Sequence, residues 1–490
     1  MKSFKCVICG YIHNGDNPPE LCSVCGASAS EFELFAQPVV ALKEQSAVWR
    51  CIVCEYIHKG SEAPDICPVC GVTKENFETY SLKESSRAKA ETGHIIILGG
   101  GIAGLAAAEE IRKRSEDMNI TIISAENPLP YYRINLTRYL AQEINKDKLM
   151  IHPDNWYTEK RIKFINGQEA NAIKTATKQV ELQDGTALTY DKLIVAMGAS
   201  PFIPPITGSN LENVVTVRTL DDAEYILKRL PVMHDCICIG GGILGLETAG
   251  AIAKSGMKVT LLESAPWLMP RQLNAQGAKV LKKYLEGIGI EVRENTKIKE
   301  ITGKDFCQGI MMEDGEIIPA ELVVITAGVK PDTSLARKAG LAVDNGLVVN
   351  NYMQTSDDNI FAAGDVTQHH GMVYGLWNVA QYQGKIAALN AIGIETQFGG
   401  VPRSSVLKVL GLDLFSIGDS SLIDDSYYQY DQEESNHYFS FVLKDSKIVG
   451  SIIIGDKALA IKVKQAVENG TSFPQDVHKD AISIIHKLQE

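Results

Sequence analysis

Four Cys-x-x-Cys pairs within the first 70 residues constrain this chain more than any other feature. They form two quartets, and the second quartet repeats the first at an offset of 45 positions. In each quartet 12 residues separate the two pairs, so two short knuckles can place four thiolates around one ion, with no open position for a substrate. The predicted metal ligands are Cys6, Cys9, Cys22, Cys25, Cys51, Cys54, Cys67 and Cys70.

The repeat extends beyond the cysteines. Tyr11-Ile12-His13 and Phe32 return as Tyr56-Ile57-His58 and Phe77, which indicates a duplicated domain. Four soft thiolates accept iron or zinc, so the pattern alone leaves the metal open. Zinc would make the two modules structural or partner-recruiting, whereas iron would make them one-electron carriers.

A glycine-rich turn opens the next part of the chain. A run of buried-strand type, His94 to Leu98, leads into Gly99, Gly101 and Gly104 and then into an alanine-rich helix. These glycines allow a tight turn that brings backbone N–H groups and a helix N-terminus onto a pyrophosphate. The following strand, expected at Ile120 to Ser124, ends near Glu126, which is placed to accept hydrogen bonds from a ribose.

The same arrangement recurs later in the chain. A strand that starts at Cys236 leads into Gly240, Gly242 and Gly245, and the next strand ends at Glu263. Two such sites predict two dinucleotides, with FAD and a nicotinamide as the usual pair. No Arg or Lys follows Glu263 before Arg271, so a 2′-phosphate would meet only negative charge, and NADH is favoured over NADPH.

Later landmarks carry a resemblance to a known family. The segments are Thr189 to Ala199, Val323 to Asp332 and Ile360 to Asp365, followed by a helix expected from Trp377 to Gly393. Together they resemble flavoprotein reductases with two dinucleotide-binding domains. Tyr132-Arg133, Gly245-Leu-Glu247 and Leu407-Lys408-Val resemble NADH:rubredoxin oxidoreductases within that group, and the N-terminal repeats resemble the rubredoxin domains of rubrerythrins.

The resemblance implies roles for individual residues. Asp365 is expected at the ribityl chain of FAD, Arg133 at its phosphates and Glu126 at the adenosine ribose. Asp365 has an alternative as the N-cap of a helix, and Trp377 as a core residue. Arg138 stands where relatives carry a Lys near the flavin. The complete set of expected cofactor-binding residues is Gly99, Gly101, Ile102, Ala103, Gly104, Glu126, Arg133, Ala170, Gly364, Asp365, Trp377, Lys408, Gly240, Gly242, Gly245, Glu247, Glu263 and Gly328.

The positions of the cysteines bear on where the electrons go. No cysteine lies between Cys70 and Cys236, so the thiol that disulfide reductases and cysteine-dependent peroxidases place at the flavin is missing. Cys236 and Cys238 fall on an apolar strand and Cys307 in a polar, loop-like stretch. We therefore expect NADH to reduce FAD and FAD to reduce two fused rubredoxin-type irons. Hydride transfer itself needs no acid–base residue, and we nominate no catalytic residue.

The resemblance also suggests the next acceptor, a rubrerythrin, rubredoxin or flavodiiron protein in oxygen or peroxide detoxification. The alternative is an NADH oxidase or reductase whose cysteine modules hold structural zinc. A net charge of −12 argues against nucleic acid and anionic membrane surfaces as partners. The sequence offers no membrane span or signal peptide, so a cytoplasmic monomer or homodimer is expected.

The predicted fold class is α/β, with two Rossmann-like FAD- and NAD(P)-binding domains and a small α/β C-terminal domain, preceded by two metal-bound rubredoxin-like domains. Strands are expected around Leu407, from Phe439 and from Ile448, and Ser420 to Asn436 reads as a solvated loop or, less readily, a docking hairpin. The expected boundaries are 1–37 and 46–82 for the rubredoxin-like domains, 83–93 for a linker, 94–211 with 330–395 for the FAD domain, 212–329 for the NAD domain and 396–490 for the C-terminal cap.

Overall fold

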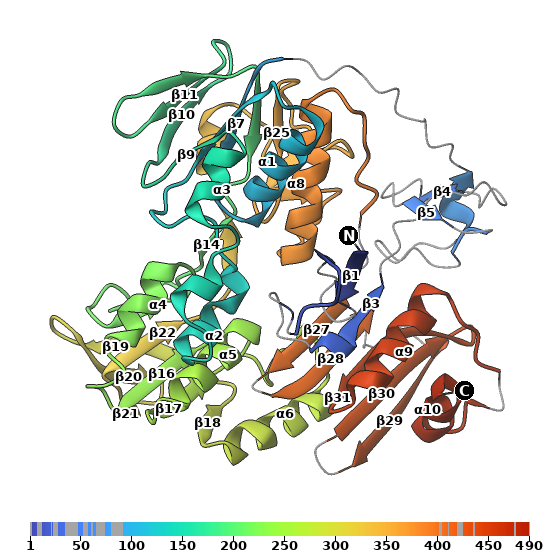
Figure 1. Ribbon diagram of the computed structural model, residues 1–490. Helices are drawn as coiled ribbons and strands as arrows, with labels where there is room; N and C mark the ends of the chain where they lie inside the picture. Colours follow the sequence, from blue (N-terminus) through green and yellow to red (C-terminus); the bar gives the residue numbers. More distant parts are fainter. Residues whose placement is uncertain are drawn as a thin grey trace.

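The computed structural model shows a chain built around three five-stranded sheets, with smaller sheets beside them (Figure 1). No helix among the described residues is both long and apolar enough to span a bilayer. The structure describes residues 2–6, 12–20, 22, 28–34, 48–51, 57–59, 62–64, 74–79, 92–400, 404–409, 411–418, 425–434, 437–474 and 477–489.

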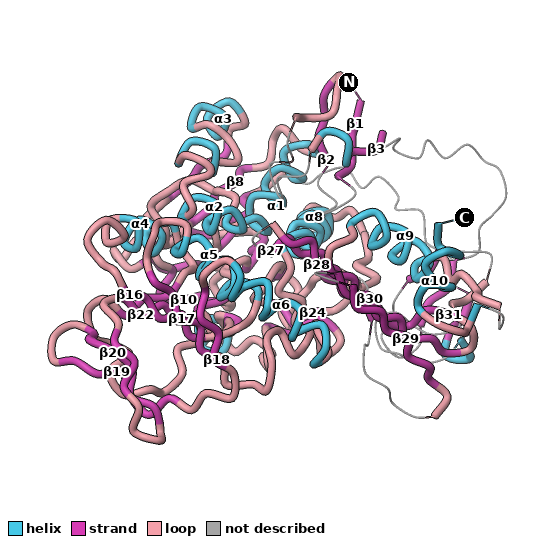
Figure 2. Tube along the Cα trace, turned by 90° about the horizontal axis from the view of Figure 1, so that it is seen from below, coloured by secondary structure: helices cyan, strands magenta, loops and turns pink. Residues whose placement is uncertain are grey.

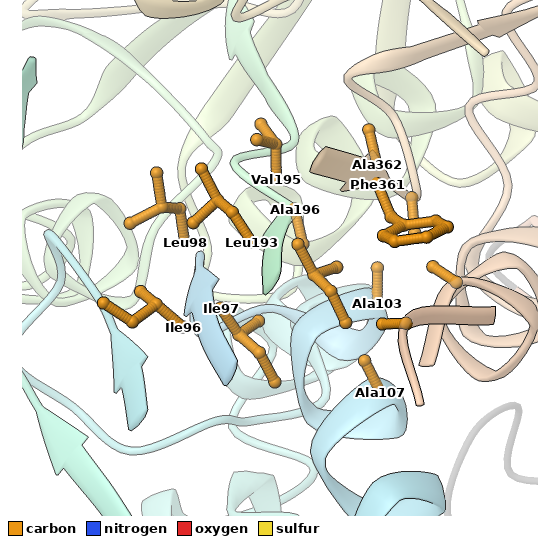
Figure 3. Packing of buried hydrophobic residues seen from close by; sticks show 14 of the residues in the cluster. Ile96, Ile97, Leu98, Ala103, Ala107, Leu193, Val195, Ala196, Phe361 and Ala362 are labelled. Carbon is orange, nitrogen blue, oxygen red and sulfur yellow. The ribbon is translucent and has the colours of Figure 1, made fainter. Parts of the chain in front are cut away.

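The first large sheet is parallel, and its strands run in the order β25-β13-β7-β8-β9. Its central strands are continuous apolar runs because both faces of a parallel sheet are covered. Figure 3 shows side chains of β7, β13 and β25 gathered beside Ala103 and Ala107 of α1. The bounds are β7 (His94–Leu98), α1 (Ile102–Arg114), β8 (Asn119–Ile123), β9 (Ile162–Ile165), β13 (Lys192–Val195), β25 (Ile360–Ala362) and α8 (Trp377–Ala391).

Helices α1 and α8 cross at very close range in this unit. A Cβ on Gly384 of α8 would stand 2.2 Å from the carbonyl oxygen of Ala103, so only glycine allows the crossing. The remaining elements of this region are η3 (Arg133–Asn135), α2 (Leu136–Leu140), η4 (Lys146–Leu149), α3 (Asp154–Glu159), β10 (Ala170–Lys174), β11 (Gln179–Leu182), β12 (Ala187–Thr189), α7 (Ser334–Lys338), β24 (Leu347–Val349) and β26 (Thr367–His369).

The second large sheet repeats the parallel arrangement in the order β15-β22-β16-β17-β18. An antiparallel pair, β14 (Ala199–Pro201) with β23 (Val329–Pro331), lies where the chain passes between the two parallel units. The bounds in the second unit are β15 (Val214–Thr216), α4 (Leu220–Leu227), β16 (Asp235–Ile239), α5 (Ile243–Ala253), β17 (Lys258–Leu262), α6 (Ala275–Gly287), β18 (Ile290–Arg293), β19 (Ile298–Gly303), β20 (Cys307–Met312), β21 (Ile317–Pro319) and β22 (Leu322–Ile325).

The third large sheet is antiparallel, in the order β27-β28-β31-β30-β29, and α9 and α10 lie on one side of it (Figure 2). The strands expected around Leu407, Phe439 and Ile448 are present. The loop expected from Ser420 to Asn436 is wrong over β29, which pairs along its full length with β30. The bounds are β27 (Ser404–Val409), β28 (Leu412–Gly418), β29 (Tyr427–Glu434), β30 (His437–Lys444), β31 (Lys447–Ile454), α9 (Lys457–Glu468) and α10 (Ala481–Gln489).

The N-terminal region contains two small antiparallel sheets with the same topology, β2-β1-β3 and β5-β4-β6. Their registers match as well, since Cys6 pairs with Phe32 and Cys51 pairs with Phe77. The side chains of Cys6 and Cys22 are buried. The bounds are β1 (Lys2–Cys6), β2 (Ile12–Gly15), η1 (Ala29–Glu31), β3 (Phe32–Leu34), β4 (Val48–Cys51), β5 (Ile57–Lys59), η2 (Lys74–Asn76) and β6 (Phe77–Thr79).

Part of the expected metal site lies outside the described residues. Cys51 is described through its backbone only. Most of the expected linker 83–93 is also outside the described part of the chain. The ligands that lie wholly outside it are Cys9, Cys25, Cys54, Cys67 and Cys70.

Candidate functional site

The first glycine turn joins β7 to α1, and its glycines differ in how closely other backbone atoms approach them. A Cβ on Gly99 would stand 2.1 Å from the carbonyl oxygen of Ala196, and one on Gly104 would stand 2.1 Å from the carbonyl oxygen of Gly99. Both positions therefore let the backbone pack closely. Gly101 differs, because nothing lies within 4 Å of the place its Cβ would take. The helix then begins with Ile102 and Ala103.

This turn fits the phosphates of a dinucleotide. Gly101 is the N-cap of α1, and no side chain caps that helix end, so N–H groups of its first turn have no side-chain acceptor. A helix N-terminus with free N–H groups and open space in front of it attracts an anion.

Two of the predicted side chains meet beside this turn. One carboxylate oxygen of Glu126 forms an ion pair with the Arg133 guanidinium. The other accepts a hydrogen bond of 2.7 Å from the hydroxyl of Tyr131. Arg133 also donates to the carbonyl oxygen of Arg218. The expected ribose acceptor and the expected phosphate donor are thus direct neighbours that form an ion pair.

Asp365 completes this group from the far end of the sheet. It follows β25, and its carboxylate lies 3.1 Å from the guanidinium of Arg218. The N–H of Gly364 donates to the side-chain oxygen of Gln383 at 2.9 Å. The alternative role of Asp365 as a helix N-cap is wrong, because the chain enters a turn and then β26 after this residue.

Three further predicted residues lie on separate elements of the fold. Trp377 is the first residue of α8, and its ring centroid lies 6.0 Å from that of Tyr132. Ala170 begins β10 and packs, half-buried, against the core of the first sheet. Lys408 lies in β27, and its side chain is outside the described part of the structure.

Glu247 lies in the first half of α5, facing α2. Its carboxylate accepts a hydrogen bond of 3.0 Å from the hydroxyl of Thr137. Arg138, the neighbouring cation, pairs instead with Glu143 at 3.4 Å. Burial raises the pKa of Glu247 from 4.5 to about 7.

Glu247→Gln should therefore stabilise the flavin-free protein at pH 8 by about 1–2 kcal/mol and change little near pH 5. The folded-state pKa lies above the unfolded value, so the wild type loses stability as the pH rises from 4.5 to 7. Glutamine has no such loss. Thermal unfolding at both pH values measures the difference, and an equal shift at both would contradict the assigned pKa.

The second glycine turn repeats the geometry of the first. A Cβ on Gly245 would stand 1.9 Å from the carbonyl oxygen of Gly240, whereas Gly242 faces open space. Gly242 is the N-cap of α5, again without a capping side chain. Glu263 accepts 2.7 Å hydrogen bonds from the N–H groups of Gly241 and Ala265. Gly328 follows β22, and space is open beside it.

The cysteines of this region are packing residues. Cys236 and Cys238 are buried on β16. The expectation that Cys307 lies in a polar loop is wrong: it is buried at the start of β20, and its thiol donates to the carbonyl oxygen of Glu321 at 3.2 Å. Burial raises the pKa of Cys307 to about 11, so the thiol is neutral near pH 7.

Sequence reasoning missed three residues of the first site. Arg218 pairs with Asp365 through its guanidinium and accepts a hydrogen bond from Arg133 through its carbonyl oxygen. The side chain of Gln383 accepts a hydrogen bond from the N–H of Gly364. The hydroxyl of Tyr131 donates a hydrogen bond to Glu126. Tyr131 is the one of the three that the sequence could have indicated, because it directly precedes the Tyr132-Arg133 pair. No local pattern marks Arg218 or Gln383.

Three family models match the chain. Residues 93–384 match the pyridine nucleotide-disulphide oxidoreductase model, which covers more than half of the 490 residues. This chain belongs to the pyridine nucleotide-disulphide oxidoreductase family. The family implies FAD and NAD(H), and the predicted α/β fold class is confirmed. Residues 4–33 and 49–78 each match the rubredoxin-like domain of rubrerythrin, and residues 404–471 match the C-terminal domain of rubredoxin NAD+ reductase.

Individual relatives place this family member more closely. It is 33% identical over 389 residues to NADH-rubredoxin oxidoreductase of Clostridium acetobutylicum, covering 79% of this chain and 98% of that protein. A crystal structure of the NADH:rubredoxin oxidoreductase of that organism superposes with a TM-score of 0.70 at 31% identity, over 81% of this chain and all of that one. The resemblance to NADH:rubredoxin oxidoreductases is confirmed.

Larger proteins carry the same oxidoreductase unit. The chain is 34% identical over 399 residues to nitrite reductase of Bacillus subtilis, covering 81% of this chain but 49% of that protein. It thus spans about half the length of the first curated relatives it matches.

Proposed function

We propose that this family member takes electrons from NADH through FAD into its own two rubredoxin-type iron centres and then passes them to an external acceptor protein. The observation that carries the proposal is the combination of two uncapped glycine turns with two N-terminal rubredoxin-like modules in one chain. The name of the Clostridium acetobutylicum relative, NADH-rubredoxin oxidoreductase, agrees with it.

The chain's own residues supply binding and orientation. When bound, FAD supplies hydride acceptance from NADH and release of electrons one at a time. The N-termini of α1 and α5 bind the pyrophosphates, Glu126 and Glu263 accept from the riboses, and Asp365 accepts from the ribityl chain. Arg133, which pairs with Glu126, would also hold the FAD phosphates, and Arg218 would keep Asp365 oriented toward the ribityl chain.

The positions of the cysteine thiols indicate which groups could accept electrons from the flavin. Cys236 and Cys307 are buried in the second unit with neutral thiols, and no cysteine lies between Cys70 and Cys236 to face the flavin. Iron held by the two cysteine quartets would supply two one-electron acceptors, enough for the two electrons of one NADH. By resemblance, the external acceptor is a rubredoxin, rubrerythrin or flavodiiron protein in oxygen or peroxide detoxification.

An anaerobic titration of the purified protein with NADH tests this function. We expect about two electrons per chain in the ferric-thiolate bands beyond those that bleach the flavin. Cys6→Ser and Cys51→Ser remove one predicted ligand from one module each, so each should lower that extra uptake by about one electron. Bleaching of the flavin alone, with zinc found by metal analysis, would overturn the proposal in favour of structural modules and a direct oxidase or reductase.

A further inference from the structure

The first metal module contacts the C-terminal domain through a charged side chain. Glu31, the last residue of η1, forms an ion pair with Lys457, the first residue of α9. Its other carboxylate oxygen accepts a 2.9 Å hydrogen bond from the N–H of Ser28. Glu31 and Lys457 are 23% and 26% exposed, so both are partly withdrawn from solvent. The hydrogen bond from Ser28 therefore orients the Glu31 carboxylate within its own module, independently of the lysine.

The contact lies close to the predicted metal ligands. Glu31 directly precedes Phe32, which pairs in register with Cys6 on β1. Cys25 is six positions before Glu31 in the sequence. The ion pair places the end of η1 next to the start of α9. The ion pair therefore joins the strand-bearing end of the module, next to the Cys6–Phe32 pair, to α9.

The other partner, α9, is connected to the cofactor region through the sheet it covers. It packs against β28 and β31, β28 pairs with β27, and β27 contacts α5, the helix that carries Glu247. A chain of packed elements thus connects α9, which contacts the first module, to α5, the helix that follows the second glycine turn.

The second module cannot make the same contact. At the repeat offset of 45, Asn76 stands in the place of Glu31, and Lys74 in the place of Ala29. An equivalent docking would set Lys457 against the neutral amide of Asn76, with Lys74 and Glu75 in the places of Ala29 and Ser30, so no carboxylate stands at the position of Glu31 and a second cation lies nearby. Like charges at a docking surface suppress the wrong partner more strongly than one ion pair attracts the right one.

Net charge attracts both modules to α9 equally, so the selection rests on the position of the charges: residues 46–82 carry three Lys or Arg and five Asp or Glu, a net charge of −2 that equals that of the first module. Residues 1–37 carry two Lys or Arg (Lys2 and Lys5) and four Asp or Glu (Asp16, Glu20, Glu31 and Glu33). Helix α9 carries three Lys (Lys457, Lys462 and Lys464) and one Glu (Glu468). An acidic module facing a basic helix gains orientation and speed of docking.

We propose that the C-terminal domain is the docking platform of the first metal module and not of the second. The two modules then have separate duties: the first receives electrons from the flavoprotein, and the second delivers them to the external acceptor. This division of labour rests on the proposed function, whereas the docking itself does not.

Zero-length cross-linking of the full-length protein tests the docking. A water-soluble carbodiimide activates a carboxylate, the neighbouring amine displaces the urea, and an amide joins the two side chains. We expect mass spectrometry to find the Glu31–Lys457 linkage, and the yield should fall at least fivefold in Glu31→Gln. Equal yields from Lys457 to Glu75 or Glu78 of the second module would overturn the inference.

Stopped-flow mixing with excess NADH tests the division of labour. Lys457→Glu should slow bleaching of the ferric bands at least fivefold at low ionic strength, and adding Glu31→Lys should restore most of the rate. Lys462→Glu is the matched control, because this lysine of the same helix donates to the carbonyl oxygen of Gln489 instead. Equal slowing by both single variants would show a general charge effect and contradict the proposal.

The two proposals fail in different ways. If the cross-link forms but no electron reaches either metal in the wild type, the proposed function fails and the docking stands. If both metals are reduced but Lys457 links to neither module, the docking inference fails and the function stands.

Discussion

Gly104→Ala should destabilise the protein by about 3 kcal/mol and lower its melting temperature by several degrees, whereas Gly101→Ala should leave the flavin-free fold unchanged. The new Cβ on residue 104 would stand 2.1 Å from the backbone oxygen of Gly99, which is far inside van der Waals contact. That oxygen cannot move away unless α1 shifts relative to β7. The Cβ on residue 101 meets no protein atom, and Gly101 has φ −81°, which alanine adopts freely.

The two variants should lose flavin for different reasons. In Gly101→Ala the methyl group occupies the space we assign to the pyrophosphate, so the purified protein should carry far less FAD per chain while its apoprotein melts normally. Differential scanning fluorimetry of the apoprotein and the ratio of flavin to protein absorbance measure both effects. Full flavin content in Gly101→Ala would show that this turn does not hold the phosphates.

Glu263→Ala should weaken NADH binding by about 10- to 100-fold and abolish discrimination against NADPH. A charged acceptor that loses its ribose hydrogen bonds gives up about 1.5–3 kcal/mol. Removal of the negative charge also ends the repulsion of a 2′-phosphate. The dependence of the flavin-reduction rate on NADH and NADPH concentration measures the two dissociation constants.

Glu263→Gln is the matched control for this result. Its amide oxygen can replace one acceptor toward Gly241 or Ala265, so the turn keeps its shape while the charge is lost. We expect it to bind NADH more tightly than Glu263→Ala and to accept NADPH nearly as well. An unchanged preference for NADH in both variants would place recognition of the 2′-position elsewhere in the protein.

The glycine turns were predictable because their chemistry is local. Gly104 is required by the carbonyl oxygen of Gly99 in the same strand–turn–helix unit, and the Gly-x-Gly-x-x-Gly pattern marks the whole unit, including Gly99, whose close neighbour Ala196 lies far away in the sequence. Arg218 could not be predicted in this way, since its partners Arg133 and Asp365 lie 85 and 147 positions away. Only the tertiary fold brings these charges together.

The errors have a common cause as well. Cys307 has polar neighbours in the sequence, but the strand that carries it turns the thiol inward. Tyr427 to Glu434 has the acidic composition of a loop, and it is an edge strand, where charge protects an open row of backbone groups. Asp365 is followed by β26 because the chain must return to pair with β24. In each case tertiary pairing overrides local composition.

The two proposed dinucleotide sites differ in how many separate segments of the chain form them, and we expect this to set how long each ligand stays bound. The first proposed site takes Gly99, Glu126, Arg218 and Asp365 from segments far apart in the sequence, and Arg133 links Glu126 to Arg218, which in turn pairs with Asp365. The second comes mainly from one continuous stretch, Gly240 to Ala265. If FAD binds the first site as we propose, it can leave only when distant segments separate, so we expect its dissociation to be slow on the scale of turnover. The second opens by local movement, which suits a coenzyme that is exchanged in every cycle.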